Sequence, residues 1–211
     1  MTIAIRPTDV LVIVDVQYDF LPGGNLAVAG GDEIVPLINQ LARKFTTVVL
    51  TQDWHPADHI SFASQHQGKA PFETVELAYG TQVLWPDHCV WNSHGAAISA
   101  ALDVPHGQLI IRKGYNRQID SYSGFQEADR ETPTGLAGYL NERDVDRLYI
   151  VGLATDFCVG WTAIDGAAAG FDVTVIEDAT RAIDNGGSLA RAWDDMAEAG
   201  VERVMSRKIL G

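Results

Sequence analysis

The chain has 211 residues, of which 46% are hydrophobic and 20% charged, a balance that is ordinary for globular proteins and excludes a disordered or fibrous chain. Its 28 acidic side chains against 15 basic ones give a formal net charge of −13, which argues against non-specific binding to nucleic acids or anionic membranes. The length suits one compact domain, and because no linker or repeat interrupts the chain we expect a single domain over residues 1–211.

The two cysteines, Cys89 and Cys158, cannot build a disulfide framework, and neither belongs to a Cys-x-x-Cys pair of the kind that holds structural zinc. The chain shows no leader-like N-terminus and no apolar run of about 18 residues. We therefore expect a cytoplasmic protein with reduced thiols.

Short β-branched runs alternate with stretches of helical periodicity along the chain. The first run, Val10–Val14, is continuously apolar, as in a strand that is buried on both faces, and apolar residues then recur at helical spacing from Ile34 to Phe45. Further strands are expected at residues 46–51, 109–111, 148–151 and 173–176, with an edge strand at 202–205. Further helices are expected near residues 134–142, 157–169 and 187–199.

This alternation predicts an α/β fold, with three α/β/α layers around a central, mostly parallel, six-stranded sheet whose crossovers are right-handed. In such a sheet, binding sites form at the carboxyl ends of the strands. The residues that directly follow the apolar runs are Asp15, Gln52 to His55, Arg112 with Lys113, and Gly152 to Cys158.

Residues 53–93 interrupt this alternation, because they show neither a helical nor a strand period. They hold three of the five tryptophans and most of the six histidines. A long irregular segment inside a compact domain is usually functional or disordered, and so many aromatic residues argue against disorder. We therefore expect a functional loop insertion here.

Glycine and small residues follow the run 148–151 and lead to Cys158, which opens an apolar helix. Thr155 or Asp156 can cap this helix, and the helix dipole is then expected to lower the pKa of the Cys158 thiol. The pattern is typical of a nucleophile at a strand-to-helix turn, although an isolated cysteine is more often a buried packing residue.

Two charged residues at other strand ends add to this pattern. Asp15 directly follows Val10–Val14, where a buried carboxylate is costly unless it is paired or has a chemical task, and Lys113 follows the run 109–111 after one residue. A structural ion pair between Asp15 and Lys113 would explain both positions. Together with Cys158, they can also form a nucleophile, a base and an electrostatic partner.

Carboxylate and imidazole groups near the second strand indicate a metal site. If that strand continues to His55, the side chains of Asp53 and His55 point to one side and can bind one ion. Pro56 disfavours a helical backbone at His55, so we do not expect His55 and His59 to pair across a helical turn. We expect His88 as the third ligand, in a set that suits Zn²⁺, Fe²⁺ or Mn²⁺. The alternative is that these are surface histidines of an ordinary loop.

These residues belong to motifs that together resemble the nicotinamidase/pyrazinamidase branch of the isochorismatase-like cysteine hydrolases. The motifs, in chain order, are VDVQYDF at 14–20 with PGG at 22–24, TQDWHP at 51–56, WPDHC at 85–89, KG at 113–114, YSGF at 122–125 and GLATDFCV at 152–159. The resemblance extends from residue 9 to about residue 180 and implies the isochorismatase-like hydrolase fold, with residues 53–93 as a metal-binding loop insertion.

The resemblance implies a catalytic triad in which Cys158 is the nucleophile, Asp15 the general acid and base, and Lys113 the third member. It also implies a cis peptide bond between Leu153 and Ala154, and an oxyanion hole formed by the backbone N–H groups of Ala154 and Cys158.

A divalent metal ion is implied in the same way, with Asp53, His55 and His88 as its protein ligands. Zn²⁺ is the first expectation, with Fe²⁺ and Mn²⁺ as alternatives. The fourth ligand stays open between His59, Ser61 and water.

The implied reaction is the hydrolysis of nicotinamide to nicotinate and ammonia through a thioester, for NAD salvage, with pyrazinamide as a second substrate. The implied walls of the substrate pocket are Phe20, Trp85 and Tyr122. The expected partner is therefore a small molecule rather than a nucleic acid or a membrane, and assembly into a homo-oligomer stays open.

Three other interpretations compete with this one. A related amidase acting on another small amide or a ureido compound would keep the triad but commonly lacks the metal motif, whereas an isochorismatase would not need Cys158. A catalytically silent binding protein of the same fold would be expected to lack a triad member. The second thiol, Cys89, follows no strand-to-helix turn, and we expect it to be a packing residue.

Overall fold

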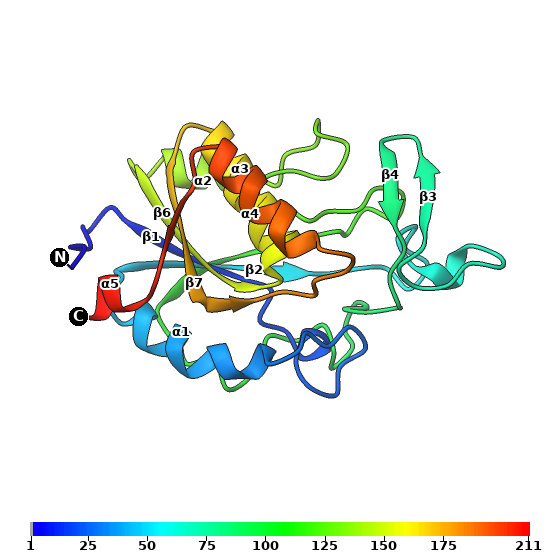
Figure 1. The fold of residues 1–211 in the computed structure, drawn as a ribbon, viewed down its shortest axis with the longest axis horizontal. Coiled ribbons are helices and arrows are strands. Elements are labelled where there is room, and N and C mark those ends of the chain that lie inside the picture. Colours follow the sequence, from blue (N-terminus) through cyan, green and yellow to red (C-terminus); the bar gives the residue numbers. More distant parts are fainter. Residues whose placement is uncertain (1) are drawn as a thin grey trace.

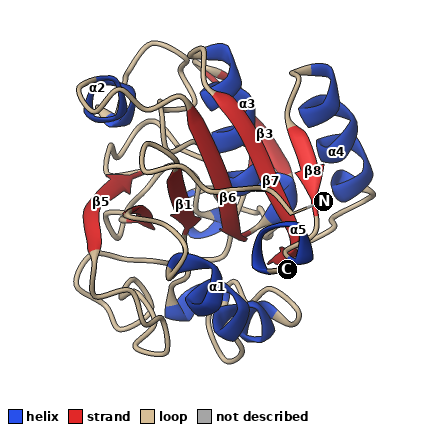
Figure 2. Ribbon diagram, turned by 90° about the vertical axis from the view of Figure 1, so that its left-hand side faces the viewer, coloured by secondary structure: helices blue, strands red, loops and turns tan. Residues whose placement is uncertain are grey.

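The computed structural model describes residues 2–211 and contains one fully parallel six-stranded sheet. The spatial order of its strands is β5 (Gly107–Lys113), β2 (Thr47–Asp53), β1 (Val10–Val14), β6 (Arg147–Leu153), β7 (Asp172–Arg181) and β8 (Glu202–Val204). All six predicted strands are present, so the predicted α/β fold with a six-stranded sheet is confirmed (Figure 2).

Helices cover both faces of the sheet, as Figures 1 and 2 show. One face carries α1 (Val35–Ala42) and α5 (Arg207–Leu210), and the other carries α2 (Leu136–Asn141), α3 (Gly160–Ala168) and α4 (Ser188–Glu198). The side chains of β1 alternate between these layers: Leu11 and Ile13 pack in the α1 cluster, whereas Val10, Val12 and Val14 pack in the other. This burial on both faces explains why the first run is continuously apolar.

Several boundaries differ from the sequence predictions. The helix expected from Ile34 to Phe45 ends at Ala42, because the following amides bond three residues back and tighten the last turn. Both β2 and β5 are longer than expected, so Asp53 and Lys113 are their last residues rather than residues after them. The strand β2 does not continue to His55, whose backbone instead bridges to the segment around residue 90.

A two-stranded antiparallel hairpin lies within residues 53–93, where no strand was predicted. It consists of β3 (Thr74–Leu77) and β4 (Gly80–Val83), and it projects from the main body at the end opposite the two termini (Figure 1). Its strands have four residues each and most of their side chains are partly or fully exposed. Short exposed strands lack the apolar alternation by which strands are found in a sequence.

The order of the strands places a crevice between β1 and β6. From β1 the chain runs to β2 and β5 on one side, and from β6 it runs to β7 and β8 on the other. Sheets of this kind bind ligands outside the carboxyl ends of the strands at the point where the direction reverses. These ends face the hairpin and the long connection between β2 and β5 (Figure 1).

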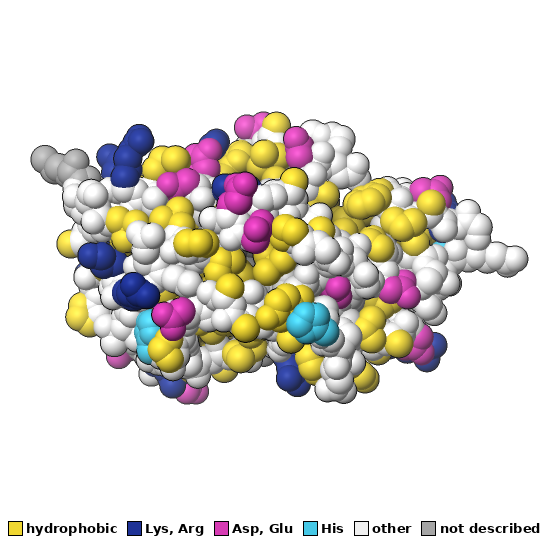
Figure 3. Space-filling view, turned by 90° about the horizontal axis from the view of Figure 1, so that it is seen from below, with side chains coloured by type: hydrophobic (Ala, Val, Ile, Leu, Met, Phe, Trp, Pro, Cys, Tyr) yellow, Lys and Arg dark blue, Asp and Glu magenta, His cyan; other side chains and the backbone are white. Residues whose placement is uncertain are grey.

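The surface and the helices add two general observations. Acidic and basic side chains are interspersed on the face seen in Figure 3, among hydrophobic and neutral ones. Among residues 2–211, every helix is too short or too polar to cross a membrane.

Candidate active site

Three functional side chains converge at the carboxyl ends of neighbouring strands. Asp15 directly follows β1, Lys113 ends β5, and Cys158 lies in a π-helical turn (Thr155–Val159) directly after β6. Gly152 of β6 has φ +112°, and a Cβ there would lie 2.1 Å from the carbonyl oxygen of Val14, so only glycine lets β6 pass this close to β1.

The Lys113 ammonium connects the members of this group. It is fully buried, with its Nζ 2.9 Å from Asp15 Oδ2 and 3.3 Å from Cys158 Sγ. It also donates to the backbone oxygen of Ser121 at 3.1 Å and forms an ion pair with Asp53 Oδ1. One cation therefore contacts the predicted nucleophile, the predicted acid and a metal-ligand candidate.

The two carboxylate oxygens of Asp15 have different surroundings. Oδ1 accepts a hydrogen bond of 2.6 Å from the Thr51 hydroxyl. Oδ2 takes part in the ion pair with Lys113 but, within residues 2–211, accepts no hydrogen bond of normal geometry. A carboxylate oxygen of Asp15 lies within 4.8 Å of Cys158 Sγ, so the acid and the thiol are neighbours in one buried group.

The protonation of the triad follows from burial and charge. Burial raises the pKa of Asp15, and the charge of Lys113 opposes this shift only in part. Burial also raises the pKa of the Cys158 thiol well above its usual value. Burial favours the neutral amine of Lys113, but the Asp15 and Asp53 carboxylates outweigh it and hold the pKa of Lys113 well above its usual range. These shifts favour a neutral Cys158 thiol beside a charged Lys113 ammonium.

Two expectations for the cysteine turn were wrong. The helix dipole does not lower the pKa of the thiol, because desolvation of Cys158 is the larger effect. Neither Thr155 nor Asp156 caps the helix with its side chain. The Asp156 carboxylate instead accepts the N–H groups of Ile183 and Asp184, at 3.0 and 2.8 Å, and so ties the turn to the loop after β7.

The implied cis peptide bond between Leu153 and Ala154 is present. Ala154 and Cys158, the residues expected to form the oxyanion hole, both line a cavity at the carboxyl ends of β1 and β6. The same cavity reaches Asp53, His55 and His88, so one space connects the thiol with the metal-ligand candidates.

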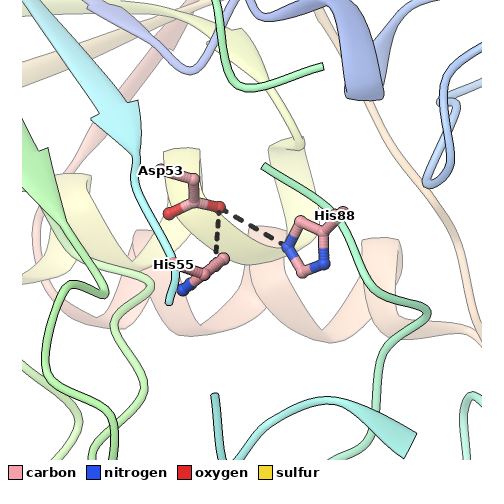
Figure 4. A group of neighbouring side chains, drawn as sticks. All are labelled: Asp53, His55 and His88. Atoms are coloured by element: carbon pink, nitrogen blue, oxygen red, sulfur yellow. Dashed lines mark ion pairs between the residues drawn. The ribbon is translucent and has the colours of Figure 1, made fainter. Parts of the chain in front are cut away.

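Asp53, His55 and His88 point toward one another, as Figure 4 shows. Asp53 Oδ2 lies 3.7 Å from His55 Nε2 and 3.8 Å from His88 Nε2, and all three residues are buried. Asp53 comes from the end of β2, His55 from the chain just beyond it, and His88 from the segment that leads away from the hairpin. The structure thus brings together the three predicted ligands, although not through the continuous strand expected for the first two.

The hydrogen bonds of the two histidines suit metal binding. His55 Nδ1 lies 2.8 Å from the Gly114 carbonyl oxygen, and His88 Nδ1 lies 2.8 Å from the Pro86 carbonyl oxygen. Each carbonyl places the ring proton on Nδ1 and leaves Nε2, the atom facing Asp53, with a free lone pair. A Cβ on Gly114 would lie 2.3 Å from the His55 ring, so this close support requires glycine.

The candidates for a fourth ligand are engaged elsewhere. His59 Nδ1 lies 2.7 Å from the Ser61 hydroxyl, and its Nε2 lies 3.2 Å from the Ile119 carbonyl oxygen. His59 groups with His55 and Asp120 rather than with the Asp53, His55 and His88 set. Burial lowers the pKa of His59 to about 4, so its ring is neutral near pH 7.

Aromatic side chains surround the cavity above the thiol. The three predicted wall residues, Phe20, Trp85 and Tyr122, all line it. The Trp85 ring packs edge-on against Phe157, with the ring centroids 4.8 Å apart. Phe157, which lies within the motif at 152–159, lines the cavity as well. The motifs do not include the other lining residues, which are Leu26, Asp120, Ser121 and Ile183. Of these, only Ser121 directly adjoins a motif, the one at 122–125, which was the one available signal.

The second thiol belongs to the core. Cys89 is fully buried in the α1 cluster, and burial raises its pKa well above the usual value. The amide of Gln17 contacts its Sγ at 3.4 Å, and its own N–H bonds to Asp19 at 2.7 Å. These contacts agree with the expected packing role.

Comparison with known proteins places this geometry in a family. The Isochorismatase domain model matches residues 9–208. A curated nicotinamidase of Acinetobacter baylyi is 62% identical over 200 residues, which are 95% of this chain and 94% of that protein.

Solved structures give the same result. A nicotinamidase and pyrazinamidase of Acinetobacter baumanii superposes with a TM-score of 0.95 at 58% identity, over 96% of this chain and 98% of that one. A protein from L. infantum in complex with nicotinate has a TM-score of 0.87 at 38% identity, over 99% and 98%. A pyrazinamidase of Pyrococcus horikoshii in complex with zinc has a TM-score of 0.77 at 37% identity, over 94% and 99%. The chain belongs to the isochorismatase family, within which these similar proteins are nicotinamidases and pyrazinamidases.

Proposed function

We propose that the protein is a nicotinamidase, which hydrolyses nicotinamide to nicotinate and ammonia through a thioester on Cys158. The observation that carries this proposal is the buried Lys113 ammonium, which contacts both Asp15 and Cys158 beneath a cavity with aromatic walls. The curated nicotinamidase at 62% identity over most of the chain supports the same activity.

The first half of the reaction starts from a neutral thiol. Because burial raises the pKa of Cys158, the thiol needs a base, and the Asp15 oxygen that accepts no hydrogen bond takes its proton. The Cys158 sulfur attacks the amide carbon while Lys113 stabilises the negative charge passing between sulfur and carboxylate. The raised pKa of Asp15 favours uptake of the thiol proton. Asp15 then passes this proton to the amide nitrogen, which leaves as ammonia.

The oxyanion of the tetrahedral intermediate needs hydrogen-bond donors. We assign this role to the backbone N–H groups of Ala154 and Cys158, which both line the cavity. Backbone donors held by a strand end and the following turn are preorganised, and one such donor is worth about 10²–10³ in kcat.

The second half of the reaction releases nicotinate. Asp15 takes a proton from water, the hydroxyl oxygen attacks the thioester carbon, and the carbon–sulfur bond breaks. The proton on Asp15 then returns to the Cys158 sulfur, which restores the neutral thiol. Atoms and charges balance over the cycle, because one amide and one water give one carboxylic acid and one ammonia.

Asp53, His55 and His88 would hold one divalent ion, for which we propose Zn²⁺. Two imidazole nitrogens and one carboxylate form a donor set that zinc favours, and a zinc complex is known for the pyrazinamidase of Pyrococcus horikoshii. Held by these residues, such an ion would supply a Lewis acid in the same cavity as the thiol. The Nδ1 contacts of both histidines keep the ligating Nε2 atoms free.

The cavity suits a small planar ring. Phe20, Trp85 and Tyr122 provide apolar walls, and the nicotinate complex of the L. infantum protein supports a pyridine ring as the occupant. Pyrazinamide, which has a ring of the same size, is expected to be a second substrate. With both thiols free, we place the enzyme in the cytoplasm, where it would return nicotinamide to NAD salvage.

The test measures ammonia and nicotinate released from nicotinamide by the purified protein, before and after chelation and after Zn²⁺ is added back. We expect turnover that falls on chelation and returns with zinc. Cys158→Ala should abolish turnover, because no other group can form the thioester. Cys89→Ala is the matched control and should retain activity.

Two results would contradict the proposal. Turnover of nicotinamide by Cys158→Ala near the native rate would remove the thioester mechanism. No release of nicotinate by the zinc-loaded native protein, with hydrolysis of a ureido compound instead, would assign the site to the related amidase.

A further inference from the structure

The hairpin β3–β4 contributes one buried polar side chain to the region beside the cavity. Gln82 on β4 is 1% exposed, whereas the strands around it are mostly exposed. Burying an amide is costly unless its hydrogen bonds are replaced. The hydrogen-bond partners of Gln82 therefore indicate which part of the site the hairpin supports.

The Gln82 amide is bonded at both of its ends. Its Nε2, which has two protons to donate, faces three acceptors: Asp120 Oδ2 at 2.7 Å, the Tyr122 hydroxyl at 3.0 Å and the Val83 carbonyl oxygen at 2.6 Å. Its Oε1 accepts from the Tyr79 hydroxyl at 3.0 Å. Since a carboxylate only accepts, the contact with Asp120 fixes which end of the amide carries the nitrogen.

The contact with Tyr122 continues to a second aromatic residue of the cavity wall. The Tyr122 hydroxyl also accepts the indole N–H of Trp85 at 3.0 Å, with the two rings edge-on and their centroids 6.2 Å apart. Both rings line the cavity, as does Asp120, whereas Gln82 does not. Gln82 thus lies behind the wall and contacts two of the residues that form it.

We propose that Gln82 is a positioning residue that holds the aromatic wall of Trp85 and Tyr122 at the spacing required by a planar ring. The hairpin β3–β4 then sets the ring affinity of the site without touching the reacting atoms. This inference rests on the proposed function, because it takes the ring of nicotinamide as the occupant of the wall.

The location of Gln82 separates its effect from that of the triad. None of its hydrogen bonds reaches Asp15, Lys113 or Cys158. Loss of Gln82 should therefore loosen the wall and weaken binding of the ring, while an amide that does bind still meets an intact nucleophile. The expected signature is a change in KM with little change in kcat.

The test compares Gln82→Met with Thr81→Val in the zinc-loaded protein. Methionine has a similar shape but no hydrogen bonds, and Thr81 is an exposed neighbour on β4 whose hydroxyl bonds only to Glu76 of the same hairpin. We expect Gln82→Met to raise KM for nicotinamide by about five- to tenfold, the size of one net hydrogen bond, with kcat within about twofold. Thr81→Val should match the native protein.

A double-mutant cycle with Tyr122→Phe tests whether Gln82 affects KM through the Tyr122 hydroxyl. If Gln82 acts through the Tyr122 hydroxyl, the double variant should have a KM close to that of Tyr122→Phe alone. Tyr79→Phe frees the Oε1 end of the amide and also removes the acceptor of the Asp120 N–H, at 3.3 Å. It should raise KM about twofold and is the substitute if Gln82→Met fails to fold.

Three outcomes would overturn the inference: a native KM for Gln82→Met, a loss of kcat at unchanged KM, or KM effects that multiply in the double variant. A melting temperature that falls in Gln82→Met while KM stays native would show a purely structural role. If the native protein itself fails to hydrolyse nicotinamide, the proposed function fails first, before any variant is compared.

Discussion

The site is built by two regions that hold their side chains in different ways. At the strand ends, Asp15, Lys113 and Cys158 are placed by the parallel backbone ladder of β5, β2, β1 and β6. The second region is the connection between β2 and β5, residues 54–106. Its side chains are positioned by short backbone bridges, such as the one between His55 and Val90, and by a few side-chain hydrogen bonds. The difference indicates that the predicted triad is positioned by the sheet, whereas the candidate metal and ring sites depend on individual polar contacts.

The largest effect is expected from Lys113→Met, which tests the strand-end region. This change leaves the Asp15 and Asp53 carboxylates buried without their cation, so activity should be lost and the free energy of unfolding should fall by about 3–5 kcal/mol. Urea unfolding and ammonia release measure the two effects. Lys69→Met, at an exposed lysine of the 54–106 connection, is the control, and turnover near native in Lys113→Met would show that the ammonium is dispensable.

His88→Ala, in the 54–106 connection, is expected to lose less stability than Lys113→Met and to bind zinc more weakly than the native protein. Removing one of three ligands should lower zinc affinity at least about tenfold, while the backbone contacts of this segment remain. Zinc content after dialysis and the melting temperature report the two quantities. His94→Ala removes an exposed histidine of the same segment, and equal zinc retention in both variants would exclude His88 as a ligand.

Gln17→Leu tests the junction between the two regions. The buried Gln17 amide accepts the Asp53 N–H at 2.8 Å and donates to the carbonyl oxygens of Asp53 and Ala96 at 2.8 and 2.9 Å. Its loss should lower the free energy of unfolding by about 1–3 kcal/mol and weaken zinc binding more than it slows the chemistry of the zinc-loaded form. An unchanged zinc affinity would mean that the two regions are held independently.

The smallest effect on activity is expected at the opposite end of the sheet. Asp9 precedes β1 and is buried, yet hydrogen bonds from Arg147 and Arg6 outweigh that burial and hold the pKa of Asp9 below its usual value. The carboxylate therefore adds stability that is fully present above the unfolded pKa near 4 and is lost as the pH falls through the lower folded pKa.

Asp9→Asn measures that contribution. The difference in unfolding free energy between the native protein and Asp9→Asn should be largest near neutral pH and should shrink below about pH 4. Nicotinamide turnover at pH 7 should stay near native. A stability difference that grows with acidity would reverse the sign of the argument.

The sequence predicted the fold closely because the sheet is specified by local patterns. Val10–Val14 is apolar throughout, so a strand buried on both faces was the simple interpretation, and the later runs repeated it. The hairpin β3–β4 was missed because its exposed four-residue strands carry no such pattern. The extension of β2 to His55 was wrong, since pairing with residue 90 depends on a distant segment.

The motifs at the strand ends named the triad and the three metal-ligand candidates, and the structure brings each group together. Residues behind the walls could not be named in this way. Gln82 lies 38 residues from Asp120 and 40 from Tyr122, and nothing in the residues around it distinguishes it from an exposed hairpin glutamine.

The sequence by itself determined which elements form and which side chains stand at their ends, because apolar periodicity and strand order act along the chain. Only the tertiary structure decided the protonation of the thiol and the support of the ring pocket. The pKa of Cys158 depends on how completely other segments exclude water from it, and desolvation overcomes the helix dipole that the local pattern emphasised. The pocket depends on hydrogen bonds between residues that meet only after the sheet, the long connection and the hairpin have packed.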